Sequence, residues 1–133
     1  MTSRLALACA AILMAAAVAL GAFGAHALRT RLAPDALVVW QTAVNYHAWH
    51  SLGLLGVGVL MMLFPHARGF VRTAWLFVAG IALFCGSLYA LALGAPRAVG
   101  FATPFGGAAL IAGWLMLACS SWSLRIAPRG DAR

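Results

Sequence analysis

The chain has 133 residues, of which 65% are hydrophobic and 8% charged, and its formal net charge at pH 7 is +7. Soluble globular domains contain about 45–50% apolar and about 25% charged residues, so this composition excludes that class. The arginines are scattered between apolar runs and do not form the basic patch typical of nucleic-acid binding. We therefore expect a single integral membrane domain over residues 1–133 that binds no nucleic acid.

The first apolar run predicts a membrane-spanning helix over about 5–25. The segment from Leu5 to Phe23 contains no charged residue, and a helix needs about 20 apolar residues to cross a bilayer. Arg4 before it and Ala25-His26-Ala27 after it also resemble a cleavable signal peptide. The apolar regions of signal peptides are usually about 7–15 residues long, so we favour a retained helix.

The second charge-free run, 36–64, is too long for one perpendicular span, because 29 helical residues extend about 43 Å. The hydrocarbon core is only about 30 Å thick. Pro34-Asp35 is typical of a helix start, and the residues after it have two faces: Leu37, Trp40 and Val44 on one, Gln41 and Asn45 on the other. We expect a short interfacial helix over about 34–45, and then a span over about 46–64 that ends at Pro65.

Two further runs predict spans over about 73–95 and about 104–124. Gly94 and Pro96 are typical of the end of a helix. Thr103-Pro104 is typical of a start, because it places a capping residue before a proline at the first helical position. The predicted fold is therefore an all-α, four-helix transmembrane bundle.

Small residues recur every four positions in two of these spans. The first stripe is Ala17, Gly21 and Ala25, and the second is Ala82, Gly86, Ala90 and Gly94. Such stripes let helix backbones approach closely in a membrane. We expect both stripes to face neighbouring helices.

The arginines predict the orientation of the bundle. One side carries Arg4, Arg68, Arg72, Arg125, Arg129 and Arg133, and the other carries Arg29, Arg31 and Arg97. Cytoplasmic segments of membrane proteins are enriched in basic residues. We therefore expect the N and C termini to be cytoplasmic.

With this topology the polar residues of the spans gather on the outer side. One residue ends the first span, two begin the second, two lie in the outer half of the third and one begins the fourth. This predicted polar cluster consists of His26, Tyr46, His50, Ser87, Tyr89 and Thr103. Polar groups inside a membrane need hydrogen-bond partners, so the cluster is either a structural connection between helices or a ligand site.

Four segments resemble a family of small membrane proteins, domain of unknown function 423: GAFGAHAL (21–28), TAVNYHAWHSLGLL (42–55), GIALFCGSLYALAL (80–93) and ATPFGGAALIAGWLMLA (102–118). The resemblance covers nearly the whole chain and implies a four-helix membrane protein without an established activity. Its motifs fall on Gly24-Ala25-His26, on Tyr46 with His50, on Gly86 to Tyr89, and on Thr103, Pro104, Gly106 and Gly107. The chain departs from the pattern at His47, where the family usually has Gln, and at Cys85, where it often has Ser.

Metal binding is the sharpest chemical hypothesis for the histidines. His47 and His50 are three residues apart on one helix, and His26 is a third candidate ligand. No Asp, Glu or Cys of the sequence accompanies them at a suitable spacing. We therefore rank the three as weak candidates and expect no metal and no cofactor.

The start of the fourth helix suggests a second kind of site. A helix N-terminus attracts anions through its free N–H groups and its dipole. Thr103, Gly106 and Gly107 would surround such a site, and Arg97 would lie on the same side of the membrane. A lipid phosphate is the ligand that we would expect there.

No catalytic motif is recognisable, so we expect that the protein is not an enzyme. The favoured function is that of a structural, accessory or membrane-stabilising component of the bacterial inner membrane. Its partners would be membrane lipids and either another membrane protein or further copies of the chain. The alternative is binding or transport of a small solute, an ion or a lipid headgroup through His26, His50, Ser87 and Thr103.

Overall fold

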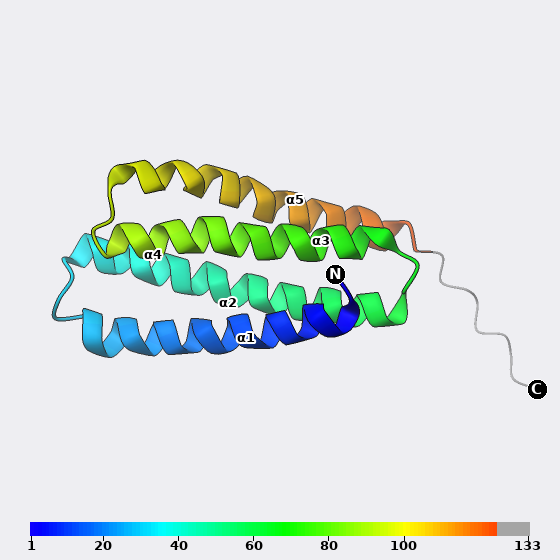
Figure 1. The fold of residues 1–133 in the computed structure, drawn as a ribbon, viewed down its shortest axis with the longest axis horizontal. Helices are drawn as coiled ribbons and strands as arrows, with labels where there is room; N and C mark the ends of the chain where they lie inside the picture. The colour runs from blue at the N-terminus through cyan, green and yellow to red at the C-terminus, as the bar shows by residue number, and fades with distance from the viewer. Residues whose placement is uncertain (125–133) are drawn as a thin grey trace, which may run out of the picture.

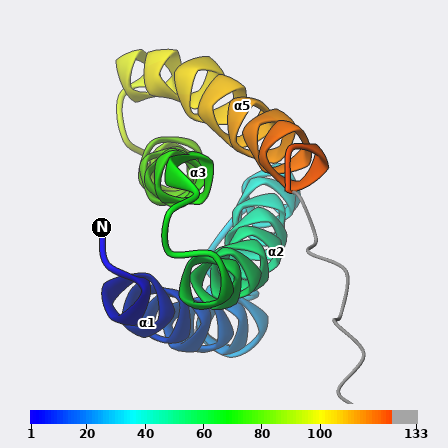
Figure 2. The same cartoon turned by 90° about the vertical axis from the view of Figure 1, so that its right-hand side faces the viewer.

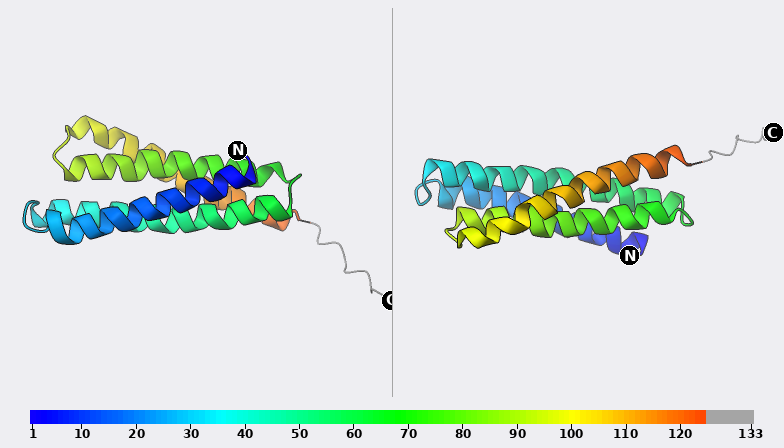
Figure 3. Two further views of the ribbon diagram at one scale, coloured as in Figure 1. Left: turned by 60° about the horizontal axis from the view of Figure 1, so that its bottom comes forward. Right: turned by 90° about the horizontal axis from the view of Figure 1, so that it is seen from above.

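The computed structural model describes residues 1–124, which form four long helices running up and down beside one another (Figures 1 and 3). The first comprises α1 (Ser3–Phe23) and a π-helical turn, η1 (Gly24–Leu28), and the second is α2 (Pro34–Leu63). The third comprises α3 (Arg68–Gly80), the π-helical turn η2 (Ile81–Cys85) and α4 (Gly86–Ala92). The fourth comprises a 3₁₀ turn, η3 (Arg97–Phe101), and α5 (Ala102–Trp122).

Each of the four helical segments is long and apolar enough to cross a membrane. No strand occurs among residues 1–124. The predicted all-α bundle of four membrane-spanning helices is therefore confirmed, although its element boundaries differ from the predicted ones by a few residues.

The third helical segment ends at Ala92, and the turn that follows it requires glycine at position 94. Gly94 has a φ of +89°, in the left-handed region that only glycine adopts at no steric cost. The Ala95 N–H donates to the carbonyl oxygen of Ala90 at 3.0 Å, as in a Schellman motif. The predicted stop at Gly94 and Pro96 is thus confirmed.

The separate interfacial helix predicted over 34–45 is wrong, because α2 is one continuous helix. Trp40, Ala43 and Val44 are buried, so this stretch packs on the bundle. The polar side chains of the stretch bond along the same helix, and the Gln41 amide donates to the Asn45 side-chain oxygen at 3.0 Å. Without a break near Asn45, nothing turns the first part of α2 into the plane of the membrane.

The four helices form an open arrangement in which each packs mainly on its neighbours (Figure 2). α1 packs against α2, α2 packs against α3, η2 and α4, and α5 packs against α3 and η2. Within residues 1–124, α1 and α5 make no extended contact with each other, and neither do α2 and α5. Grooves therefore remain between helices that are not packed together.

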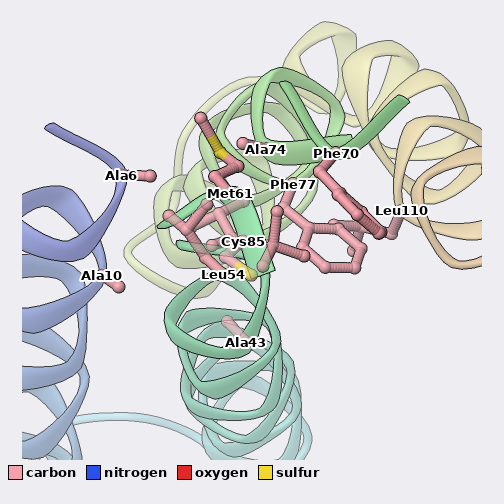
Figure 4. Close-up of a cluster of buried hydrophobic side chains, with 12 residues drawn as sticks. Ala6, Ala10, Ala43, Leu54, Met61, Phe70, Ala74, Phe77, Cys85 and Leu110 are labelled. Atoms are coloured by element: carbon pink, nitrogen blue, oxygen red, sulfur yellow. The ribbon is translucent and has the colours of Figure 1, made fainter. Parts of the chain in front are cut away.

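The hydrophobic core lies where the second, third and fourth helices meet, with alanines of α1 at its edge (Figure 4). Phe70, Phe77 and Leu54 are its largest fully buried side chains. Gly106 lets α5 approach η2, because a Cβ at this position would lie 2.8 Å from the Phe84 Cα. Gly106 belongs to neither of the two predicted packing stripes.

The stripe predicted in the third span does not pack closely against another helix, because Ala82 and Gly86 line an open hollow between this segment and α1. Ala82 and Gly86 are exposed, and a Cβ at Gly86 would meet no atom within 4 Å. The π-helical turn η2 interrupts the regular α-helical spacing of this segment, so positions four apart no longer continue one stripe. In the first span Ala17 is buried and Gly21 lies close to Val44, as predicted, whereas Ala25 is exposed.

The two ends of the bundle separate the arginines as predicted. Met1 and Ser3 lie beside the turn at Phe64 to Ala67, at the end where Arg4, Arg68 and Arg72 stand. The opposite end carries the connections with Arg29, Arg31 and Arg97 (Figure 1). Arg125, Arg129 and Arg133, which provide the arginine excess of the cytoplasmic side, lie outside the described residues. The cytoplasmic location of the termini stays a prediction.

Candidate functional site

Ser87 and Thr103 connect the third and fourth helical segments through a hydrogen bond of 2.7 Å between their hydroxyl oxygens. The Ser87 hydroxyl also donates to the Phe84 carbonyl oxygen at 2.9 Å. Because a hydroxyl has a single proton, Thr103 is the donor in the bond to Ser87. These two predicted cluster residues are therefore brought together, with their polar groups satisfied by each other and by the backbone.

His47 and Tyr89 connect α2 to α4. The Tyr89 hydroxyl lies 3.3 Å from the His47 Nδ1, and the two rings are tilted with centroids 6.1 Å apart. His47 is 5% exposed, and its Nε2 is buried without a hydrogen-bond partner among the described residues. The histidine that departs from the family pattern thus makes a bond between helices.

Trp40 connects α2 to α1, a contact that sequence reasoning missed. Its indole N–H donates to the Leu20 carbonyl oxygen at 3.0 Å, and its ring lies against Phe23 and Tyr89. Gly24 makes room for the indole, since a Cβ there would lie 2.7 Å from the Trp40 Cδ1. The Gly-Ala-His motif could have pointed to such a close approach, but not to its partner.

His26 is not part of the cluster. It is exposed in η1 and has no hydrogen bond among the described residues. Gly24, in the same turn, packs against Trp40, and ten residues of helix, about 15 Å, separate Trp40 from His50. The prediction that His26 and His50 belong to one cluster is therefore wrong. Sequence reasoning had placed both on the outer side, His26 at the end of the first span and His50 near the start of the second, whereas His50 lies near the middle of α2.

His50 is surrounded by aromatic rings at mid-height of the bundle. Its ring centroid lies 5.7 Å from that of Phe77, 6.0 Å from that of Trp114 and 5.8 Å from that of Tyr46. Its Nδ1 lies 2.6 Å from the carbonyl oxygen of Tyr46, one turn earlier in the same helix. Of the predicted cluster, only Tyr46 therefore contacts His50.

A groove between α2, η2 and α5 opens beside His50, with a volume of about 400 Å³. Aromatic side chains dominate its lining: Tyr46, Trp49, Phe84 and Trp114. Sequence reasoning missed Trp49, Phe84 and Trp114, because only the relative height of the helices brings them together. A volume of this size is within the range of ligand sites in proteins.

The anion site predicted at the start of the fourth helix is wrong. The 3₁₀ turn over Arg97–Phe101 precedes α5, so the chain is already helical before Thr103. Thr103 bonds to Ser87 instead of capping a helix, and Gly106 is buried against Phe84. Gly107 lies one residue further into the helix, and Arg97 is exposed at the far end of the 3₁₀ turn. These four residues therefore do not surround a common site with free N–H groups.

The weak metal candidates do not converge either. His47 contacts Tyr89 while His50 contacts Phe77 and Trp114, and His26 lies apart from both. Within residues 1–124, no group of three or more His, Cys, Asp or Glu side chains is arranged to hold a metal ion. The two histidines of α2 thus belong to different surroundings.

Four apolar helices linked by partly buried hydrogen bonds define a small multi-pass membrane protein. A family model described as "Protein of unknown function (DUF423)" matches residues 20–107. The chain belongs to this family, as its four motifs indicated.

Curated relatives support the assignment over most of the chain. The UPF0382 membrane protein SSP2132 of Staphylococcus saprophyticus is 43% identical over 81% of this chain and 88% of its own length. The UPF0382 membrane protein YwdK of Bacillus subtilis is 44% identical over 76% of this chain and 82% of its own. The UPF0382 inner membrane protein YgdD of Escherichia coli is 42% identical over 88% of both chains. No solved structure matches the chain. The protein is thus a multi-pass protein of the bacterial inner membrane, from a family of unknown function.

Proposed function

We propose that this protein is a non-enzymatic structural or accessory component of the bacterial membrane. The observation that carries the proposal is the set of three partly buried hydrogen bonds between helices. Trp40 joins α2 to α1, His47 joins α2 to α4, and Thr103 joins α5 to α4. Every helical segment is therefore joined to a neighbour by at least one polar contact.

Such bonds suit a protein that holds a fixed shape in lipid. Lipid tails are as apolar as the helix surfaces, so burial of apolar groups does not drive helices together in a membrane. Close packing and hydrogen bonds must then fix the position of each helix along its neighbour. Three of the six cluster residues, Ser87, Tyr89 and Thr103, bond between helices in this way, which favours a structural role over transport through the cluster.

The accessory role requires a surface for partners, and two faces of the open bundle are available. α1 exposes Ile12 and Val18, and α5 exposes Phe105 and Ile111, each by more than 60% of its surface. The partners that we propose are membrane lipids together with another membrane protein or a further copy of the chain.

Photo-crosslinking in native membranes tests this proposal. A photoreactive amino acid would replace Ile12 in one variant and Ile111 in another, each in the full-length chain. We expect a discrete protein adduct from at least one position, identified by mass spectrometry. A variant labelled at buried Leu54 is the matched control and should give only intramolecular products. Lipid adducts alone at both exposed positions would contradict an accessory role.

A further inference from the structure

The protonation pattern of His50 leaves one ring nitrogen available. Its Nδ1 lies 2.6 Å from the Tyr46 carbonyl oxygen, and a carbonyl oxygen can only accept a hydrogen bond. Nδ1 therefore carries the proton. In the neutral ring, Nε2 is then an acceptor, and no group among residues 1–124 donates to it.

The free Nε2 of His50 belongs to a residue that is nevertheless well buried. His50 is only 6% exposed, and it forms part of the wall of the groove between α2 and α5. The Nε2 of His47 is the one buried, partnerless side-chain nitrogen or oxygen found within residues 1–124. Since the His50 Nε2 also lacks a partner and is not among the fully buried atoms, part of its surface is open, and the groove is the hollow that His50 lines.

The groove beside His50 adjoins a second hollow, and Trp114 lines both of them. Around His50 the lining of the groove is mainly aromatic, with Tyr46, Trp49, Phe84 and Trp114, and Gly107, Leu110 and Ile111 of α5 complete it. The second hollow has a volume of about 620 Å³. This second hollow runs along α2 and α5, and its walls are apolar or glycine: Leu52, Gly53, Leu55, Gly56, Val57, Val59, Leu60 and Leu117. An aromatic head compartment thus adjoins an apolar tail compartment.

The chemistry of the two compartments selects the occupant. Aromatic walls favour a flat ring, which gains from offset or edge-to-face contacts. The free acceptor requires a donor such as a hydroxyl group. No charged residue lines either compartment, and His50 lies near mid-height of α2. A phospholipid headgroup stays at the membrane surface, so the depth favours a neutral head.

We propose that this groove binds a lipid-soluble aromatic alcohol, of the quinol class, with its hydroxyl donating to the His50 Nε2 and its apolar tail lying along α2 and α5. Tyr46, Trp49 and Trp114 are exposed at the rim, so the molecule enters sideways from the lipid. This binding role goes beyond the structural function and does not depend on it.

Equilibrium binding to the full-length protein in detergent micelles tests the proposal, with empty micelles subtracted. The probe is radiolabelled 2-decyl-1,4-benzoquinol, and its dimethyl ether, which has no hydroxyl donor, is the matched ligand control. We expect saturable quinol binding and an affinity for the ether about tenfold lower, the effect of one lost hydrogen bond. Decan-1-ol, a hydroxyl without a ring, should also bind at least about tenfold more weakly.

Substitutions separate the two compartments. His50→Phe keeps an aromatic ring but removes Nε2, so quinol and ether should bind it equally. His47→Phe changes the histidine outside the groove and should keep the preference for quinol. A Cβ at Gly56 or at Gly86 would meet no atom within 4 Å, but only Gly56 lines the groove. Gly56→Leu should weaken binding of the decyl probe and leave binding of 1,4-benzoquinol, which has no tail, unchanged. Gly86→Leu should change the binding of neither ligand.

Several results would overturn the proposal. One is equal affinity of the wild type for quinol and ether, and another is equal loss of decyl-quinol binding in Gly56→Leu and Gly86→Leu. Binding of decan-1-ol as tight as that of quinol would reject the aromatic specificity. Efficient disulfide formation between two copies of a Gly56→Cys variant in native membranes would assign the groove to an interface between copies instead.

Discussion

His47 and His50 stand three residues apart on α2, yet their rings contact different helices. The His47 ring pairs with Tyr89 of α4, whereas the His50 ring lies between Phe77 of α3 and Trp114 of α5. A residue three positions along an α-helix is displaced by about 60° around the axis. Since the third helical segment packs against α2, this displacement places one histidine on each side of it. One histidine then joins helices while the other faces a groove.

Replacing Ser87 by Ala should lower the free energy of unfolding by about 0.6 kcal/mol, the average for side-chain hydrogen bonds between helices in a membrane, and by no more than about 1.7 kcal/mol, the maximum. The reason is the loss of the 2.7 Å bond to Thr103. Unfolding by sodium dodecyl sulfate in mixed micelles, followed by circular dichroism, measures it. Thr103→Val should have a similar effect, and the double variant should lose less than the sum of the two. Strictly additive losses would show that the two hydroxyls are not coupled.

Tyr89→Phe should destabilise the protein by about 1–3 kcal/mol, because it leaves a buried ring nitrogen of His47 without its partner. The same unfolding assay applies. Tyr46→Phe is the matched control, since the Tyr46 hydroxyl bonds to no group among the described residues and the side chain is exposed. If the two tyrosine variants had the same free energy of unfolding, the His47–Tyr89 contact would contribute nothing to the stability of the protein.

Gly106→Ala should be far more damaging than Gly107→Ala, although the two glycines are neighbours. A Cβ at Gly106 would press on the backbone of Phe84, whereas a Cβ at Gly107 would lie 3.6 Å from the Phe84 ring, at ordinary contact distance. Overpacking of this kind typically costs about 1–3 kcal/mol. Thermal unfolding of both variants in the same detergent measures the difference. Equal melting temperatures would mean that α5 can move away from η2 freely.

Single cysteines should report both termini on the cytoplasmic side. In a variant without its three natural cysteines, Thr30→Cys should react with a membrane-impermeant maleimide in intact spheroplasts. His66→Cys should react only after the membrane is opened. The expectation follows from the arginine excess at the end that carries Arg4, Arg68 and Arg72, together with the arginines after residue 124. If His66→Cys reacted in intact spheroplasts and Thr30→Cys reacted only after the membrane was opened, both termini would lie on the outer side.

The helices themselves were predictable because apolar runs of this length have one stable conformation in lipid. The coupling of Ser87 with Thr103 was also within reach, since both residues belong to the predicted cluster. The position of His50 was not. The sequence shows that α2 is longer than the membrane is thick, but it does not show whether the excess bends away or continues as one helix. The assumed break after Asn45 placed His50 at the surface, whereas the continuous helix places it near the middle.

The faces of the third segment were unpredictable for a related reason. A π-helical turn such as η2 changes which residues share a face, and no signal in residues 81–85 announces it. The interpretation of Ala82 and Gly86 as packing residues failed there. His47 departs from the family pattern and was not part of the predicted polar cluster, yet it bonds to Tyr89 of a neighbouring helix.

The open order of the helices bears on how the chain assembles during synthesis. When α2 is synthesised, its packing partner α1 has already been made. When the third segment is synthesised, its packing partner α2 has already been made. The fourth segment packs against the third. Within residues 1–124, α1 and α5 make no extended contact, so no packing of α1 has to be delayed until α5 is made. Each helix that leaves the ribosome can therefore dock on the one before it, and no earlier pair has to separate. The bundle can grow in the direction of translation, one docked helix at a time.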